Sequence, residues 1–440
     1  MIGLPMEIPA RATDEDRQDL SAAAGEVPHT TAPNATSRFS PIDIVVVLHG
    51  VFLAVVVGVD GPAPWPSVRA LVALGCTFAA LVVSRRTRPR CRGSALLTLG
   101  LAGVIIGGGI GLPHVVKDGV SAEAVSGIAA LATGLALIAV ATTILLRGTR
   151  WRRKLLAVPV GIGIAVLIVV PLTMAVFVTN VPPLALGDAT PADRGLAFED
   201  VSIRAADGVQ LAAWYVPSAN GAAVVLLGGA TNTRSDEIDH AAVLARNGYG
   251  VLLLDARGHG ESDGDAMLWG WFGETDVRAA VDHLASRPDV TDGRIGAIGM
   301  SMGAEEAIGA AGSDTRIRAV VAEGASARGP LDEGDPAEGV GGWLIHYIDW
   351  TTTRAADLMT SADRPVKLRD AIAAAAPRPF MIIAAGTQPV EIDAGNVFQA
   401  VSPDSVELWV VPNAGHTQGY DVEPAEWEAR VIAFLDRSLD

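Results

Sequence analysis

A series of apolar segments in the first half of the chain limits most strongly what this protein can fold into. The segments cover residues 44–59, 68–83, 94–112, 122–146 and 155–179. A helix that crosses the hydrocarbon core of a bilayer needs about 20 mainly apolar residues, and the last two segments reach that length easily. We therefore predict a transmembrane helical domain over residues 41–183 with about five spans. Four spans are the alternative, because the first segment is short and lies between Asp43 and Asp60.

The residues in front of these segments have a different character. Residues 1–40 are polar, rich in Pro, Thr, Ala and acidic side chains, and show no apolar periodicity. A segment of this composition cannot bury enough apolar surface to fold alone, so we predict a disordered N-terminal tail. We do not interpret it as a signal peptide, because no basic start is followed directly by a short apolar stretch.

The loops between the apolar segments differ sharply in charge. Residues 84–92 and 147–154 are rich in arginine, whereas loop 60–66 has no Lys or Arg and loop 113–121 has only Lys117. Because loops rich in Lys and Arg stay in the cytoplasm, both arginine-rich loops are expected inside. One further span then follows, which places the C-terminal part outside. The sequence therefore predicts a multi-pass protein of the cell membrane with an extracytoplasmic C-terminal domain.

Charge also divides the chain into two parts near residues 180–183. Residues 1–183 contain 15 Lys+Arg and 10 Asp+Glu, and the remaining residues contain 18 and 39. The overall net charge of −16 argues against nucleic acid as a partner, because phosphate binding needs a basic face. The two cysteines exclude a disulfide framework and a cysteine-based structural zinc site. We expect no metal and no cofactor.

From about residue 198, short apolar runs of strand type alternate with helical patterns. This alternation is typical of a mostly parallel sheet with helices on both faces. We therefore predict an α/β, doubly wound domain over residues 184–440, preceded by the all-α transmembrane bundle. Residues 326–372 interrupt the alternation and are rich in Trp, Gly and Asp, so we interpret them as an insert.

One joint between an expected strand and an expected helix carries a candidate nucleophile. Residues 299–303 read Gly-Met-Ser-Met-Gly, which matches G-x-S-x-G with a strand before it and a helix after it. A sharp strand-to-helix turn holds its central residue in a strained backbone conformation and projects the side chain above the sheet. The residue in that position is Ser301. The helix N-terminus also favours negative charge there.

A serine hydroxyl needs a base that takes its proton, and the base needs a carboxylate that orients it. His416 follows an expected strand over residues 406–411 and a turn, which makes it the candidate base. After the expected strand at residues 380–384, Glu391 is our preferred acid, and Asp393 is the alternative. Either carboxylate could instead cap the helix that follows.

The negative charge that develops on a substrate oxygen needs two backbone N–H donors. The residue after the nucleophile, Met302, supplies one candidate. The turn after the expected strand at residues 223–227 supplies the other, for which Ala230 is preferred and Gly229 is next.

Together, these motifs make residues 198–440 resemble the α/β-hydrolase family. The resemblance rests on GMSMG at 299–303, DARGHGESDG at 255–264, GGA at 228–230 and AGH at 414–416. It implies a Ser–His–acid hydrolase without a metal, such as an esterase, lipase, thioesterase or serine aminopeptidase. It also implies that the insert at 326–372 is a cap. Its side chains Trp343, Tyr347, Trp350 and Met359 would either bind acyl chains or serve packing.

The sequence departs from the family pattern at three positions. Gly228 stands where the family usually has His, and Ala304 stands where a second glycine usually follows the turn. Pro389 occupies the usual place of the acid, which is why Glu391 is preferred.

The expected function is therefore a membrane-anchored serine hydrolase of ester or thioester bonds, with amide bonds as a further option. An acyltransferase that uses the same residues and a non-catalytic membrane scaffold or sensor are the alternatives. The expected partners are a small-molecule or lipid acyl substrate and the lipid bilayer. The sequence does not indicate the substrate or the oligomeric state.

Overall fold

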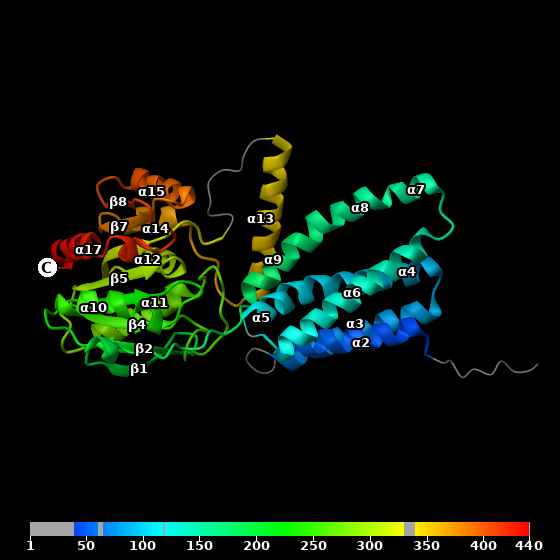
Figure 1. The fold of residues 1–440 in the computed structure, drawn as a ribbon, viewed down its shortest axis with the longest axis horizontal. Coiled ribbons are helices and arrows are strands. Elements are labelled where there is room, and N and C mark those ends of the chain that lie inside the picture. Colours follow the sequence, from blue (N-terminus) through cyan, green and yellow to red (C-terminus); the bar gives the residue numbers. More distant parts are fainter. Residues whose placement is uncertain (1–38, 60–64, 118, 330–338, 440) are drawn as a thin grey trace, which may run out of the picture. The chain divides into compact units, whose positions relative to one another are not determined.

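The computed structural model describes residues 39–59, 65–117, 119–329 and 339–439, of which residues 43–439 belong to one compact unit (Figure 1). The tail predicted over residues 1–40 lies almost entirely outside the described residues. The described part contains a group of long apolar helices, followed by a domain built on one sheet.

Four helices of the described part are long and apolar enough to cross a membrane. The first is α3 (Trp65–Arg86) and the third is α6 (Ala122–Leu146). The second is a continuous helix made of α4 (Pro89–Ile106), η1 (Gly107–Gly111) and α5 (Leu112–Lys117). The fourth is made of α7 (Trp151–Leu155), α8 (Ala157–Ile164), η2 (Ala165–Val169) and α9 (Val170–Thr179). The first predicted span corresponds to α2 (Pro41–Val56), which has 16 residues. Among the described residues, the predicted bundle of about five helices thus consists of four helices of spanning length, the number given as the alternative, and one shorter apolar helix just below the range of about 17–25 residues.

Glycines allow the second and third of these long helices to pack closely. A Cβ atom built on Gly107 would lie 2.4 Å from the carbonyl oxygen of Gly127, and one built on Gly100 would lie 2.7 Å from that of Gly134. Contacts this short exclude any side chain, so the backbones of α4 and α6 approach each other directly. Small residues of this kind are the usual basis of helix packing in membranes.

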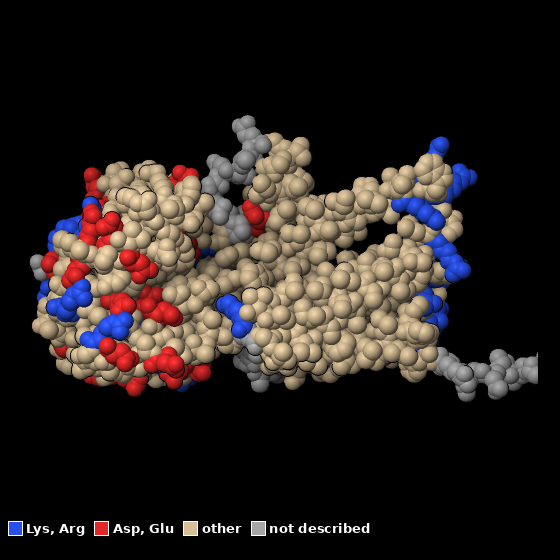
Figure 2. Space-filling model, in the orientation of Figure 1, with Lys and Arg blue, Asp and Glu red and all other residues tan. Residues whose placement is uncertain are grey.

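Most of the basic side chains of the apolar helices gather at one end of the group (Figure 2). Arg85 and Arg86 form the last turn of α3, and Arg152, Arg153 and Lys154 lie in α7. The two arginine-rich loops of the sequence therefore lie at the same end of this group of helices.

The C-terminal domain contains an eight-stranded sheet with the strand order β1-β2-β4-β3-β5-β6-β7-β8. The strands are β1 (Glu199–Arg204), β2 (Gln210–Val216), β3 (Ala223–Leu227), β4 (Gly250–Leu254), β5 (Ile295–Met300), β6 (Ile317–Glu323), β7 (Phe380–Ala385) and β8 (Val406–Val411). β1 and β2 pair antiparallel, as does β2 with β4, and the remaining pairs are parallel. The α/β, mostly parallel fold predicted from the sequence is confirmed.

Helices cover both faces of this sheet, so the central strands are buried throughout. On one face the core includes α11 (Gly273–Ala285), α12 (Met302–Ser313) and α14 (Leu368–Ala375), with Phe398 of α15 (Pro389–Val401). On the other face it includes α10 (Ile238–Arg246) and α17 (Pro424–Leu439). Burial on both faces explains why these strands appear in the sequence as continuous apolar runs.

The described part of the predicted insert consists mainly of one helix, α13 (Gly339–Met359). It packs against the last apolar helix, where the Tyr347 hydroxyl donates a hydrogen bond to the carbonyl oxygen of Leu167 (3.2 Å). α14 begins at Leu368, before the expected end of the insert, and buries Leu368 and Ile372 in the core of the domain.

Candidate active site

Ser301 lies at a sharp corner between β5 and α12. Its backbone has φ 53° and ψ −117°, a conformation that residues other than glycine rarely adopt. A Cβ atom on Gly299 would lie 2.2 Å from the backbone of Gly303, so the corner tolerates no side chain at that position. The Ser301 N–H donates to the carbonyl oxygen of Glu323 (2.7 Å), which fixes the corner to the next strand. The side chain is thereby directed away from the strand.

His416 lies in the loop that follows β8, and its ring reaches the serine. The two atoms His416 Nε2 and Ser301 Oγ are 2.8 Å apart. Asn413 and Thr417, which flank the histidine, both have positive φ angles of 62° and 56°. A Cβ atom on Gly324 would lie 3.0 Å from His416 Cε1, so this glycine leaves room for the ring. The side chain of His416 is 50% exposed.

Glu391 holds the other side of the imidazole. Its Oε1 lies 2.7 Å from His416 Nδ1, and its Oε2 accepts the N–H of Ala385 (2.8 Å). The carboxylate is buried and sits in the first turn of α15. Asp393, the alternative acid, is on the same helix but is exposed to solvent. The structure therefore brings Glu391 to His416 and leaves Asp393 outside the group.

These contacts determine the proton positions and the electrostatics of the imidazole. An ionised carboxylate only accepts hydrogen bonds, so the His416 Nδ1 carries the proton and Nε2 is free to accept from the Ser301 hydroxyl. The hydrogen bond to Glu391 raises the pKa of His416 above its ordinary value, against the opposing effect of partial burial. Charged Glu305 and Glu323 nearby act in the same direction as Glu391.

The predicted backbone donors lie beside the serine. Met302 is the first residue of α12, so its N–H has no partner within the helix. Gly229 follows β3, and a Cβ atom on it would lie 3.4 Å from the Cβ of Ser301. The carbonyl oxygen of the next residue, Ala230, lies 3.0 Å from His259 Nε2, which anchors this turn. The three residues Gly229, Ala230 and Met302 thus surround the Ser301 corner.

The turn at residues 255–264 is linked to the Gly229–Ala230 turn by a buried ion pair. Asp255 is fully buried and forms an ion pair with the buried Arg234, whose own N–H also donates to the Asp255 carboxylate (2.7 Å). Burial raises the pKa of Asp255, and the hydrogen bonds and charge of Arg234 oppose that effect. Arg234 follows the Gly229–Ala230 turn in sequence, so the ion pair ties this turn to the end of β4. The sequence motif indicated Asp255 but gave no signal for Arg234.

A further buried carboxylate near the site, Glu323, was not identified from the sequence. Its Oε1 accepts the N–H of Gly419 (2.7 Å) and its Oε2 accepts the indole N–H of Trp427 (2.9 Å). Burial raises the pKa of this group. Because the carbonyl oxygen of Glu323 also holds Ser301, this residue connects the serine corner to the loop that carries His416. The only feature of the sequence that points to Glu323 is its position as an acidic residue at the end of an apolar strand.

His240 of α10 is largely buried beside aromatic rings. It packs between the rings of Tyr420 and Trp427, with centroid distances of 5.1 Å to both. Its Nδ1 lies 3.0 Å from Glu237 Oε2.

In the described part of the chain, no group of three or more His, Cys, Asp or Glu side chains is arranged to hold a metal ion.

Known proteins resemble the part of the chain that contains this site. The family described as X-Pro dipeptidyl-peptidase (S15 family) matches residues 191–386. The chain is 32% identical over 134 residues to thiohydrolase aneE of Aspergillus aculeatus, a match that covers 28% of this chain and 40% of that protein. It is 30% identical over 118 residues to the alpha/beta hydrolase domain-containing protein WAV2 of Arabidopsis thaliana, covering 26% and 38% respectively.

A solved structure is similar as well. The esterase Pf2001 of Pyrococcus furiosus is 28% identical, with a TM-score of 0.46, and the match covers 59% of this chain and 100% of the esterase. The chain spans only between 38% and 41% of the length of the curated relatives named above and of the mycobacterial proteins that it also matches.

Proposed function

Because the sheet-bearing part of the chain belongs to the α/β-hydrolase family, we propose that the protein is a membrane-anchored serine hydrolase that cleaves ester or thioester bonds. One observation carries this proposal. Ser301, His416 and Glu391 form a continuous hydrogen-bonded chain with distances of 2.8 Å and 2.7 Å. Such a chain activates a hydroxyl that is otherwise a poor nucleophile.

The proposed reaction proceeds in two halves. Ser301 Oγ attacks the substrate carbonyl carbon while His416 Nε2 takes the hydroxyl proton, and the C–O or C–S bond to the leaving group breaks as His416 returns that proton to it. Glu391 stabilises the imidazolium that forms and keeps the ring oriented. Water, deprotonated by His416, then hydrolyses the acyl-enzyme. The N–H groups of Met302 and Ala230, with Gly229 next, stabilise the oxyanion in both halves.

Substrate chemistry is tested by comparing matched acyl groups. We expect the purified protein in detergent to hydrolyse p-nitrophenyl esters and the corresponding thioesters of short acyl chains. The name of one relative, a thiohydrolase, supports the inclusion of thioesters. Peptide amides provide the third substrate class. Failure to turn over any of the three would contradict the proposed function.

An acyltransferase would form the same acyl-enzyme and pass the acyl group to an alcohol or amine. Product analysis with and without an added acceptor separates the two activities. A non-catalytic scaffold has less support, because a carboxylate does reach His416 (2.7 Å).

The pH dependence provides a test of the Glu391 assignment. His416 must be neutral to act as a base, and its pKa is raised chiefly by the hydrogen bond to Glu391. Activity is therefore expected to fall as the pH decreases through a value above 6.5. In Glu391→Gln the pKa of His416 decreases, so this acidic limb moves to lower pH, while kcat falls about 10,000-fold. The profile of kcat/KM against pH measures both effects, and an unmoved acidic limb would exclude Glu391 as the partner.

Asp393→Asn is the matched control, because it removes an exposed carboxylate from the same helix. It is expected to leave both the limb and kcat within about twofold of the original protein, as surface substitutions usually do.

We also propose that the hydrolase domain is extracytoplasmic. Cys91 is exposed in the first turn of α4, within the arginine-rich segment 84–92 that the positive-inside rule places in the cytoplasm. In a Cys76→Ser background, a membrane-impermeant maleimide should leave Cys91 unlabelled in intact cells and label it after permeabilisation. Ala219→Cys, at an exposed position of the hydrolase domain, should label in intact cells. The reverse pattern would place the domain in the cytoplasm.

A further inference from the structure

Helix α13 of the insert has two halves of different character. Its first ten residues, 339–348, contain no Asp, Glu, Lys or Arg, and His346 is their one basic side chain. Three large apolar side chains in this half are nonetheless exposed: Val340 by 85%, Trp343 by 62% and Ile345 by 57%. Exposed apolar side chains that gather in this way mark a surface that contacts another protein or a membrane.

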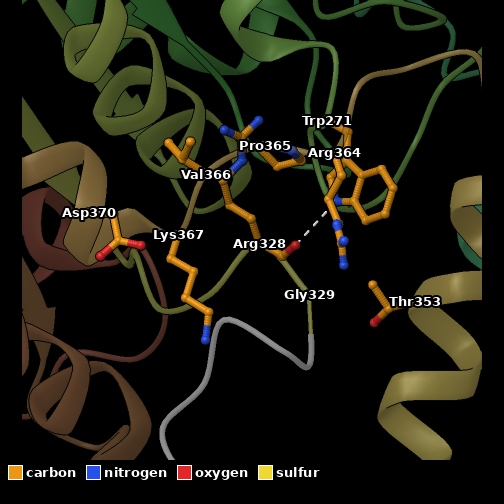
Figure 3. Close-up of a pocket in the computed structure, with 9 residues that line it drawn as sticks. All are labelled: Trp271, Arg328, Gly329, Thr353, Arg364, Pro365, Val366, Lys367 and Asp370. Atoms are coloured by element: carbon orange, nitrogen blue, oxygen red, sulfur yellow. Dashed lines mark hydrogen bonds between the residues drawn. The ribbon is translucent and has the colours of Figure 1, made fainter. Parts of the chain in front are cut away.

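The second half of α13 packs against the rest of the chain instead. Ala355 is buried in an apolar cluster together with Trp271. Thr353 lines a cavity of about 360 Å³ with Trp271 and the segment 364–367 (Figure 3). This half also contains the acidic residues and the arginine of the helix, namely Asp349, Arg354 and Asp357. Packing within the described residues thus accounts for the second half of the helix, but not for the exposed side chains of the first.

Two contacts align α13 with the last apolar helix. The Tyr347 hydroxyl donates to the carbonyl oxygen of Leu167 (3.2 Å), and the Thr179 hydroxyl lies 4.0 Å from the sulfur of Met359. Twelve residues separate 347 from 359, and twelve also separate 167 from 179. The two helices therefore run side by side in the same direction over about 18 Å, given a rise of about 1.5 Å per residue.

The position of Leu167 along its helix gives its depth in a bilayer. Basic side chains at residues 152–154 keep that end of the helix at the headgroups, so the hydrocarbon part begins near Leu155. A hydrocarbon core of about 30 Å needs about 20 residues of helix and therefore ends near residue 175. Leu167 then lies about 18 Å from one edge of the core and about 12 Å from the other.

The depth of Leu167 sets the depth of both halves of α13. Tyr347 contacts Leu167, so it lies within the hydrocarbon core. Met359 contacts Thr179, which lies past the end of the core, so the second half ends outside it. The residues before Tyr347 continue the helix away from Met359. The exposed apolar side chains of the first half therefore lie on the hydrocarbon side.

We propose that the first half of α13, residues 339–348, is embedded in the lipid bilayer beside the last spanning helix, where its exposed apolar side chains contact lipid acyl chains. The same kind of surface continues on the spanning helix, whose Ile168 and Val170 are 43% and 44% exposed. Lipid is the occupant because a water-soluble partner does not reach this depth. The lack of Asp, Glu, Lys and Arg in this half agrees with that environment, in which charged side chains are costly.

This inference rests on the membrane anchoring in the proposed function and extends it, because the insert becomes an additional embedded segment. It does not depend on the hydrolase chemistry. It also gives the exposed aromatic side chain of Trp343 a partner, the lipid, that packing within the protein does not supply.

Collisional quenching measures the depth of a single position. The full-length protein in a Cys76→Ser, Cys91→Ser background receives the substitution Ile345→Cys, is labelled with an NBD fluorophore and is placed in phosphatidylcholine nanodiscs. A nitroxide near the end of a lipid acyl chain quenches a fluorophore in the hydrocarbon, whereas aqueous iodide quenches one in water. We expect strong quenching by the lipid nitroxide and loss of quenching by iodide. Val340→Cys, at an 85% exposed position, is a second test site if the first variant does not fold.

Two further positions provide matched controls. Leu358→Cys lies on the same helix at an 88% exposed position beside Met359, so iodide should quench its label and the lipid nitroxide should not. Ile162→Cys lies on the spanning helix and is 59% exposed, close to the 57% of Ile345, so the lipid nitroxide should quench its label.

Each outcome decides between the occupants of this surface. Iodide quenching at position 345 equal to that at position 358 would place the first half of α13 in water and overturn the inference. Protection from both quenchers would mean that protein, such as a second copy of the chain, covers the surface, which also overturns it. A label at position 162 that the lipid nitroxide does not reach would instead contradict the membrane anchoring itself, and this inference with it.

Discussion

Ser301→Ala is expected to abolish labelling by a fluorophosphonate probe and to lower kcat for a short-chain ester on the order of a million-fold. The reason is geometric. The hydroxyl at this corner lies 2.8 Å from the His416 Nε2. Alanine keeps the backbone of the corner and removes only the attacking atom. Labelling intensity on a gel and initial rates of ester hydrolysis measure the loss.

The control for this variant is Ser313→Ala at the other end of the same helix. Ser313 donates only to the carbonyl oxygen of Ala310 (3.3 Å), so labelling and rate should stay close to those of the original protein. Persistent labelling of Ser301→Ala at the original intensity would mean that another residue is the nucleophile.

His416→Ala is expected to cause a loss of similar size, about a million-fold in kcat, because the serine then has no base. The side chain is 50% exposed, so its removal leaves a space that opens to solvent. Added imidazole is therefore expected to restore part of the activity in a concentration-dependent way. Such rescue distinguishes the loss of a base from a general loss of structure.

His346→Ala provides the comparison for this experiment. His346 lies in α13, away from the Ser301 group, and its removal should change the rate by less than about twofold. If His416→Ala retained most of its activity without imidazole, the proposed role of this residue would be wrong.

Much of the fold was predictable because each strand of the sheet carries a local signal. The central strands β3, β4 and β5 are fully buried, and their continuous apolar runs are separated by helical patterns. The corner at Ser301 was predictable for a similar reason. Close backbone contact requires glycine beside this corner, because a Cβ atom added to Gly299 would lie 2.2 Å from the backbone of Gly303.

The choice between Glu391 and Asp393 could not be made from the sequence. Both carboxylates lie within the first five residues of one helix, and only the direction of each side chain separates them. In the structure, position 391 faces the Ala385 N–H and the histidine, whereas position 393 faces solvent. Helical geometry decides this, since residues two positions apart point in different directions.

Long-range contacts account for the other features that the sequence did not reveal. Glu323 and Trp427 are more than a hundred positions apart, and no local pattern indicates that they are partners. Among the apolar helices, α2 covers residues 41–56, so the apolar run at 44–59 predicted its length of 16 residues but placed both ends three residues too late.

The most direct measurement is the mass spectrum of the peptides obtained after labelling the full-length protein with a fluorophosphonate probe. A single adduct on the peptide that contains residues 299–303, located at Ser301 by fragmentation, is the predicted result. No adduct on Ser301, or an adduct of equal yield on the His416→Ala protein, would contradict the account, because the hydroxyl would then not depend on its imidazole for reactivity.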